Sequence, residues 1–206
     1  MTSARMRRRA IACAALAIAA VAPASARGAE IGQTAPPGES VGGCLAATQT
    51  DTAPGTPTYA VPFDGEITTW RHQATAEVMP LRLQVFRQTK FTFPPEWLVV
   101  GQSRLETPVA NKLNVFRTSI AVRAGDQLAL SAAATPGSHV VACHFLSRNG
   151  EDNLQTFPRT YAPGETAREE GPGISAVRLN VSATVVDVCR NKHGKVKKPS
   201  WCSKRR

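Results

Sequence analysis

Apolar and polar residues alternate in short runs along most of this chain. In LRLQVF (81–86) the leucines and the valine fall on one side, and the arginine and the glutamine fall on the other. Residues that alternate with a period of two lie on opposite faces of a β-strand. The same pattern recurs in SAVRLNVSATVVDV (175–188), where one face is apolar and the other is polar. The apolar face holds Val177, Leu179, Val181, Ala183 and Val185, and the polar face holds Arg178, Asn180, Ser182 and Thr184.

Glycine and proline interrupt these runs throughout residues 32–175 and mark turns between strands. Clear examples are Asp64-Gly65, Gly125-Asp126 and Asn149-Gly150. Short alternating runs that are broken about every ten residues are typical of an antiparallel sandwich or barrel. One segment, TTWRHQATAEVM (68–79), also fits a helical period. We therefore predict a single all-β antiparallel domain over residues 31–187.

The first 26 residues have the pattern of a secretory signal peptide. Four arginines precede residue 10, a short apolar run follows at 10–22, and Ala24-Ser25-Ala26 has the small side chains of a cleavage site. The apolar run is shorter than the roughly 20 residues that a membrane-spanning helix needs. No other long apolar run follows it. We predict export, by the general secretory or the twin-arginine route, and an extracellular or envelope-associated product without a transmembrane segment.

Basic residues are concentrated at the two ends of the chain. The net charge is +10, but four basic residues belong to the signal segment and eight lie between Asp187 and Arg206. The body between them is close to neutral. A nucleic-acid-binding domain carries its basic patch on the fold itself, so the main domain is not expected to bind nucleic acid.

Four cysteines remain after the signal segment: Cys44, Cys143, Cys189 and Cys202. An even number of cysteines in an exported chain indicates disulfides, and four allow three connectivities. We favour the pairs Cys44–Cys143 and Cys189–Cys202, the second of which would close a basic tail over residues 188–206. The alternative is a zinc site formed by Cys189, His193 and Cys202. No C-x-x-C spacing supports it, so no metal and no cofactor are expected.

Ser40 lies in a G-x-S-x-G match, GESVG, which is the pattern of a serine hydrolase elbow. Such an elbow needs a strand before the serine and a helix after it. Two prolines precede Ser40 and no helical period follows, so we interpret the match as coincidental and expect no enzyme. His72 and His144 have no carboxylate partner that spacing can place, and alternation points His144 away from the core. Asn180-Val181-Ser182 has the form of a glycosylation sequon, but it lies within a predicted strand.

Two groups of residues are candidates for ligand contact. Trp70 and Trp97, together with Tyr59 and Phe63, would form a stacking face for sugars, although large aromatic residues also fill ordinary cores. In the tail, Lys195, Lys197, Lys198 and Trp201 would bind an anionic wall polymer or lipid headgroups, with about 1 kcal/mol from each cation near an anionic surface. A tail that only adds solubility is the alternative.

Several segments resemble a group of secreted β-sandwich proteins of high-GC actinobacteria, for which no activity is established. These segments are IGQT (31–34), SVGGCLAATQT (40–50), YAVPFDGEITTW (59–70), LRLQVFR (81–87), LNVFRTSIAVRAGDQLAL (113–130) and LNVSATV (179–185). The resemblance implies a jelly-roll-like sandwich at or beyond the cell surface. Many members continue into Asp-rich repeats, whereas this chain carries its basic tail instead.

These observations predict a secreted, non-enzymatic β-sandwich protein that binds or adheres at the cell envelope. A carbohydrate-binding module is the first alternative, and an extracellular enzyme is the second. The expected partner is an anionic cell-wall polymer or a glycan.

Overall fold

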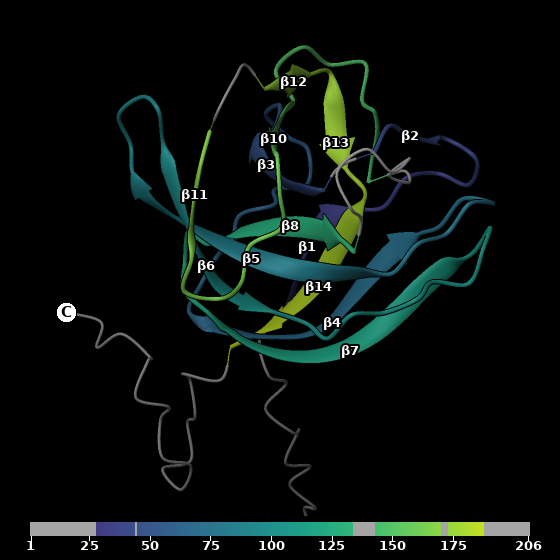
Figure 1. Cartoon of the computed structure of the whole chain (residues 1–206), viewed down its shortest axis with the longest axis horizontal. Coiled ribbons are helices and arrows are strands. Elements are labelled where there is room, and N and C mark those ends of the chain that lie inside the picture. Colours follow the sequence, from purple (N-terminus) through teal and green to yellow (C-terminus); the bar gives the residue numbers. More distant parts are fainter. Residues whose placement is uncertain (1–27, 44, 134–142, 170–172, 188–206) are drawn as a thin grey trace, which may run out of the picture.

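The structure is a computed structural model, and it describes residues 28–43, 45–133, 143–169 and 173–187. Within these ranges the regular structure consists of fourteen strands and no helix. Every pair of these strands is antiparallel (Figure 1). The prediction of an all-β antiparallel fold is therefore confirmed. The signal segment and the tail at 188–206 lie outside the described residues.

The strands form three sheets. The first contains, in spatial order, β1 (Gly28–Gln33), β14 (Val181–Val186), β4 (Gly65–Gln73) and β7 (Leu113–Val122). The second contains β11 (Thr166–Arg168), β6 (Glu96–Gln102), β5 (Leu81–Lys90), β8 (Gln127–Ala132), β3 (Ala46–Asp51), β10 (Asn153–Phe157) and β12 (Ile174–Ser175). The third contains β13 (Val177–Leu179), β9 (His144–Leu146) and β2 (Ser40–Val41).

The third sheet was not expected from the sequence, which indicated only two layers. The long alternating run at its C-terminal end divides at Asn180, so that β13 pairs with β9 while β14 pairs with β1 and β4. Most of the polar face of this run is therefore buried, and Thr184 is only partly so. Arg178, Asn180 and Ser182 are all buried, because a strand that changes sheets has neighbours on both of its faces.

The helical alternative over residues 68–79 is wrong. Residues 65–73 form strand β4, which pairs with β14 on one side and β7 on the other. Trp70 and Phe116 are opposite residues on β4 and β7, and their ring centroids lie 4.5 Å apart. This cross-strand contact and the burial of Ile67 and Trp70 outweigh the local helical period.

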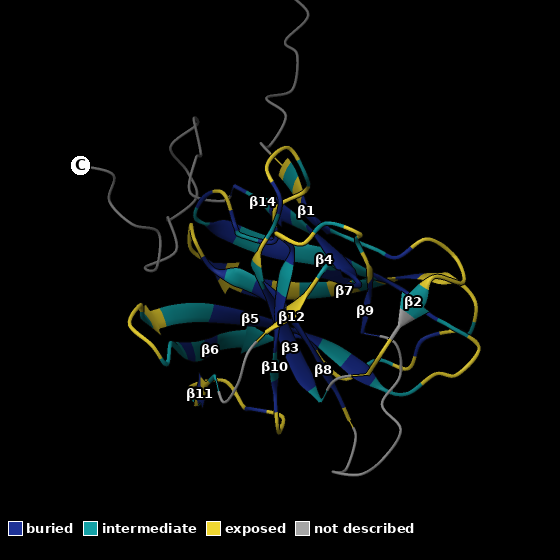
Figure 2. Ribbon diagram, turned by 90° about the horizontal axis from the view of Figure 1, so that it is seen from above, coloured by how far each residue is buried: buried dark blue, intermediate teal, exposed yellow. Residues whose placement is uncertain are grey.

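The main core lies between the four-stranded and the seven-stranded sheets. Its members come from both, for example Ile67 and Val185 from the first and Leu83 and Leu128 from the second. Figure 2 shows the buried residues along the middle of these strands and the exposed ones in the loops. Each fully buried aliphatic or aromatic side chain contributes about 1.5–3 kcal/mol.

A second apolar cluster lies on the opposite face of the seven-stranded sheet. In it Phe86 of β5 meets Phe157 of β10, with ring centroids 5.2 Å apart. Strands β8 and β3 lie between them in the sheet, and in a flat sheet β5 and β10 would be about 14 Å apart. The sheet therefore curls into a half-barrel, and this second cluster fills the concave side.

Candidate functional site

A polar cleft opens on the concave side of the half-barrel. Its volume is about 330 Å³, and β3, β5, β6, β8 and β10 all contribute to its wall. Four amide side chains line it: Gln88, Gln127, Asn153 and Gln155. Two carboxylates, Asp51 and Glu169, the hydroxyl-bearing Thr50 and the indole of Trp97 complete the polar part of the described lining.

Strand alternation places the amides in this cleft. In β8 Leu128 belongs to the main core, and Gln127 therefore faces the other side of the sheet. In β10 Leu154 belongs to the main core, and Gln155 faces the cleft. The period-two pattern thus gives the half-barrel an apolar convex side and a largely amide-lined opening on its concave side.

The amides retain hydrogen-bonding capacity for a ligand. Gln155 is only 4 % exposed, and its Nε2 donates to the carbonyl of Thr156 at 3.0 Å. Its Oε1 accepts no hydrogen bond from any residue that the structure describes. The side chain of Gln127 likewise has no partner among those residues. Both amides therefore offer an acceptor oxygen to a ligand donor in the cleft.

The two carboxylates have different environments. The indole Nε1–H of Trp97 donates to Oε1 of Glu169 at 2.9 Å. Burial raises the pKa of Glu169, and the negative charge of Asp51 also raises it, although the hydrogen bond from Trp97 opposes the change. Asp51 is exposed at the end of β3. Neither carboxylate takes part in an ion pair within the described part of the chain.

The aromatic residues singled out from the sequence do not form a common surface. Trp70 is fully buried, and Tyr59 and Phe63 are also core residues. Trp97 is 3 % exposed and belongs to the second cluster, so that it contributes mainly its Nε1–H edge to the site. None of the four therefore offers an open ring face for stacking. Trp201, Lys195, Lys197 and Lys198 lie outside the described residues.

Sequence reasoning missed the aromatic residues that are exposed. Phe91 and Phe93 are 81 % and 82 % exposed in the loop that joins β5 to β6. The same hairpin contributes Gln88 and Pro95 to the cleft wall. Phenylalanine is ordinarily assigned to a core, and no local pattern in the run FTFPP marks these two rings as exposed.

Ser40 lies at the junction of the third sheet with β14, away from the cleft. Its Oγ accepts a hydrogen bond from Nδ2 of Asn180 at 2.8 Å and is 3.3 Å from the carbonyl oxygen of His144. Ser40 itself belongs to the two-residue strand β2, and no helix of a hydrolase elbow follows it in the described residues. Gly42 has a φ of +58°, and a Cβ there would collide with the imidazole of His144. This glycine is thus explained by local packing.

Both histidines near this junction are buried. His144 is nevertheless only 7 % exposed, because its imidazole packs closely against Gly42. Burial lowers the pKa of His144. Burial also lowers the pKa of His72, although the hydrogen bond between its Nδ1 and the carbonyl of Asn180, 2.9 Å long, opposes this.

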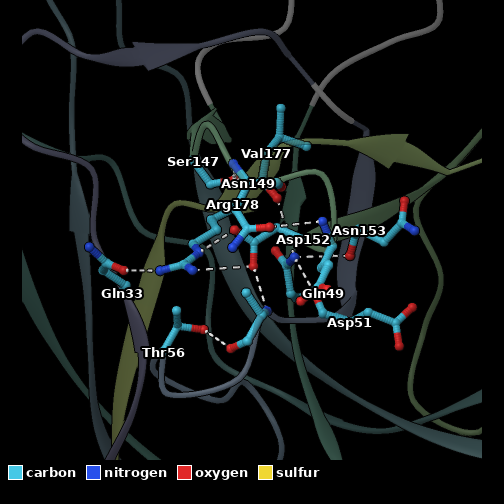
Figure 3. Close-up of polar contacts among 12 residues, drawn as sticks. Gln33, Gln49, Asp51, Thr56, Ser147, Asn149, Asp152, Asn153, Val177 and Arg178 are labelled. Carbon is cyan, nitrogen blue, oxygen red and sulfur yellow. Dashed lines mark hydrogen bonds and ion pairs between the residues drawn. The ribbon is translucent and has the colours of Figure 1, made fainter.

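A buried ion pair joins the third sheet to the half-barrel (Figure 3). Arg178 of β13 contacts both carboxylate oxygens of Asp152, and it also donates to Oε1 of Gln33 at 2.8 Å. Asp152 in turn accepts from the backbone N–H of Ala53 at 2.9 Å. Burial alone raises the pKa of Asp152, but hydrogen bonds from Arg178 and Ser147 outweigh it and hold the pKa below its ordinary value. Because its charges are fully paired, we assign this cluster a structural role.

The cysteine pairs stay predictions. Cys143 is buried against the main core and is disulfide-bonded, but Cys44, Cys189 and Cys202 all lie outside the described residues. No disulfide joins two described residues. The zinc alternative at Cys189, His193 and Cys202 also falls outside them. Among the residues that the structure does describe, no group of three or more His, Cys, Asp or Glu side chains is arranged to hold a metal ion.

Three comparisons with known proteins complete the description of the site. No protein-family model, no curated protein and no solved structure matches this chain. In the described ranges no helix is long and apolar enough to cross a membrane. The sequence resembles secreted actinobacterial sandwich proteins, and the structure supports one part of that resemblance: the protein is all-β and has several sheets.

Proposed function

We propose that the protein is a secreted, non-enzymatic glycan-binding β-protein whose ligand occupies the polar cleft of the half-barrel. The observation that carries this proposal is the lining of the cleft, in which four amides and two carboxylates surround a volume of about 330 Å³. Most small-molecule sites are lined mainly by apolar side chains. A cleft lined by planar amides instead fits a ligand with many hydroxyl groups.

The donor and acceptor inventory supports this ligand class. Each sugar hydroxyl donates one hydrogen bond and accepts others, and an amide side chain offers both a donor and an acceptor. Gln127 and the Oε1 atom of Gln155 are without partners in the described part of the chain, so they are available at the site. Export of the protein, its place at the cell envelope and a jelly-roll-like relation to actinobacterial sandwich proteins rest on the sequence and belong to this proposal.

Binding to a glycan array that includes neutral, acidic and amino sugars tests the proposal, followed by calorimetry with the sugars that bind. Gln127→Ala and Gln155→Ala should each weaken binding about three- to tenfold, because each removes a neutral hydrogen bond worth about 0.5–1.5 kcal/mol. The control is Ser119→Ala, an exposed position on β7 of the other sheet. A blank array, or binding that both glutamine variants leave unchanged, would overturn the proposal.

A glycoside hydrolase is the second candidate, favoured by one observation. The cleft holds two carboxylates, of which Glu169 has a raised pKa and Asp51 is exposed. Two carboxylates in one cleft, one of them with a raised pKa, are the arrangement of an acid and its partner in glycosidases. Release of reducing ends from a bound oligosaccharide, lost in Glu169→Gln, would establish catalysis. Intact oligosaccharide after long incubation would leave binding as the function.

The cationic tail is a separate part of the proposal. Deletion of residues 188–206 should abolish retention of the protein on anionic wall polymers and leave oligosaccharide binding in the cleft unchanged. Unchanged retention after the deletion would mean that the tail only adds solubility.

A further inference from the structure

We infer that the cleft selects a glycan that carries a protonated amine, namely an amino sugar whose nitrogen is not acetylated. This inference rests on the proposed glycan-binding function and specifies the charge of its ligand. It starts from the balance of charge in the cleft, which holds the carboxylates Asp51 and Glu169 and no basic side chain among its described lining residues.

Neighbouring basic residues do not neutralise these two carboxylates. Arg168 precedes Glu169 in the chain, but its guanidinium pairs with Glu96, 3.1 Å away. Arg87, on the same strand as Gln88, pairs with Asp126 at 2.7 Å. Each of these cations is thus engaged elsewhere, and the cleft keeps an uncompensated negative potential. Such a potential concentrates cationic ligands in a cleft and repels anionic ones.

The hydrogen-bonding groups of the cleft point to the same ligand by an independent route. Gln155 is buried to more than nine-tenths, and its Oε1 is an acceptor without a donor among the described residues. The two carboxylates add further acceptors to the site and, when ionised, no donor. An ammonium group has three donors and no acceptor, so it is the group that satisfies such a site most fully.

Both carboxylates can bind an ammonium group without breaking the contacts that they make within the protein. Glu169 keeps one oxygen on the indole of Trp97, and its second oxygen has no hydrogen-bond partner among the described residues. Asp51 is exposed at the end of β3 and makes no ion pair in the described ranges. A hydrogen bond between a cation and a carboxylate is stronger than one between neutral groups. The amine is therefore favoured over an uncharged amide at the same sugar position.

Calorimetry with two matched ligands tests this inference. One is a β-1,4-linked glucosamine oligomer, and the other is the N-acetylglucosamine oligomer of equal length. The unacetylated oligomer should bind about tenfold more tightly or better, since a charged hydrogen bond contributes about 1.5–3 kcal/mol. Its advantage should shrink at high salt, because screening weakens interactions between exposed charges.

Two isosteric variants identify the groups responsible. Asp51→Asn and Glu169→Gln should each remove most of the preference for the unacetylated oligomer while leaving binding of the acetylated one. Glu66→Gln, an isosteric change on β4 away from the cleft, is the matched control. Glutamine at 169 retains an acceptor for the Trp97 indole, and position 51 is exposed. The thermal midpoint of each cleft variant should therefore be no lower than that of the parent protein.

The outcomes separate this inference from the function on which it rests. Equal binding of the two oligomers, or a preference that both cleft variants leave intact, would overturn the inference while glycan binding stands. Binding of spermidine as tight as that of the glucosamine oligomer would also overturn it, because an amine without a sugar would then suffice. If neither oligomer binds, and neither the parent protein nor Gln155→Ala binds any glycan on the array, both the inference and the proposed glycan-binding function are overturned.

Discussion

Arg178 and Asp152 form a two-point ion pair inside the protein, with Nε 2.9 Å from Oδ2 and Nη2 3.2 Å from Oδ1. Arg178 is 8 % exposed and Asp152 is fully buried. The pair ties strand β13 to the turn before β10, and Asp152 also holds the backbone of Ala53. One carboxylate thus fixes the third sheet against an edge of the half-barrel, close to the strand that carries Asn153 and Gln155.

Breaking this pair from one side should strongly destabilise the protein. Arg178→Met leaves Asp152 buried without its cation, and removal of one partner of a buried pair costs about 3–5 kcal/mol. Urea unfolding at neutral pH measures the loss. The control is Arg159→Met, which removes the partner of Glu165 from a pair whose two side chains are both exposed and should lower the free energy of unfolding by about 1 kcal/mol at most. Equal effects of the two variants would contradict the structural role given to Arg178.

The buried His72 should make the protein less stable in acid. Burial lowers its pKa in the fold, whereas in the unfolded chain the ring titrates near its ordinary value of 6.5. The contribution of neutral His72 to the free energy of unfolding is therefore fully present above pH 6.5. It is lost as the pH falls below that value, because the unfolded state takes up a proton that the folded state does not. Thermal midpoints measured from about pH 8 downward should show this slope.

His72→Asn is the variant that separates titration of this ring from other effects of acid. Its amide keeps a donor for the carbonyl of Asn180, with which Nδ1 of His72 makes its hydrogen bond. The variant should show a smaller loss of stability below pH 6.5 than the parent protein. A slope as steep as that of the parent would assign the acid sensitivity to other groups, such as His144.

Glu169→Gln should stabilise the protein at neutral pH. Burial and the charge of Asp51 raise the pKa of Glu169 in the fold above its ordinary 4.5. A raised carboxyl pKa favours folding below the unfolded value, and this contribution is lost as the pH rises through the folded value. At neutral pH the charge is then unfavourable by less than about 1 kcal/mol, because the side chain is partly solvated and screened. A lower thermal midpoint in the variant would contradict this account.

Asn180 should be among the polar residues most sensitive to substitution. Its Nδ2 donates to Ser40 Oγ and to the carbonyl of Gln73, and its Oδ1 accepts from the backbone N–H of Ala35. Asn180→Ala removes all of these hydrogen bonds at once and should cost about 2–4 kcal/mol. Chemical denaturation measures this loss, with Ser119→Ala as the neutral control. A loss below about 1 kcal/mol would mean that water replaces the amide at this junction.

The exposed hairpin should extend the binding site. We expect the double variant Phe91→Ser and Phe93→Ser to weaken binding of long oligosaccharides several-fold and to leave short ones unaffected, since these rings lie beyond the cleft wall on the β5–β6 hairpin. The free energy of unfolding should change by less than about 0.5 kcal/mol, as for other surface positions. A marked loss of stability would show that the two rings pack within the fold.

The sequence predicted the strands well because their signal is local. Alternation in residues 81–86 identified the buried face of β5, and all of Leu81, Leu83 and Val85 belong to the main core. The Asp64-Gly65 and Asn149-Gly150 dipeptides lie at or between the ends of strands, as expected. The same local signal misled at Trp70, where a helical period competed, because only the partner strands β7 and β14 decide that this segment is extended.

The candidate site could not be predicted in the same way. Gln88, Gln127, Asn153 and Gln155 are far apart in the chain and read individually as the outward positions of strands. They converge only because the seven-stranded sheet curls, which brings β5 and β10 to the same cavity. Of the two roles that the sequence left open for Trp70, a stacking face or a core, burial decides for the core.

By itself the sequence determined that this protein is built from antiparallel strands, and which face is apolar in residues 81–86 and 177–185, because both depend on a two-residue period. Tertiary structure alone decided that the long C-terminal run divides between two sheets at Asn180, that Arg178 meets Asp152, and that four amides and two carboxylates share one cleft. The physical reason is that sheet curvature and strand exchange depend on contacts between residues distant in the chain, to which no local pattern is sensitive.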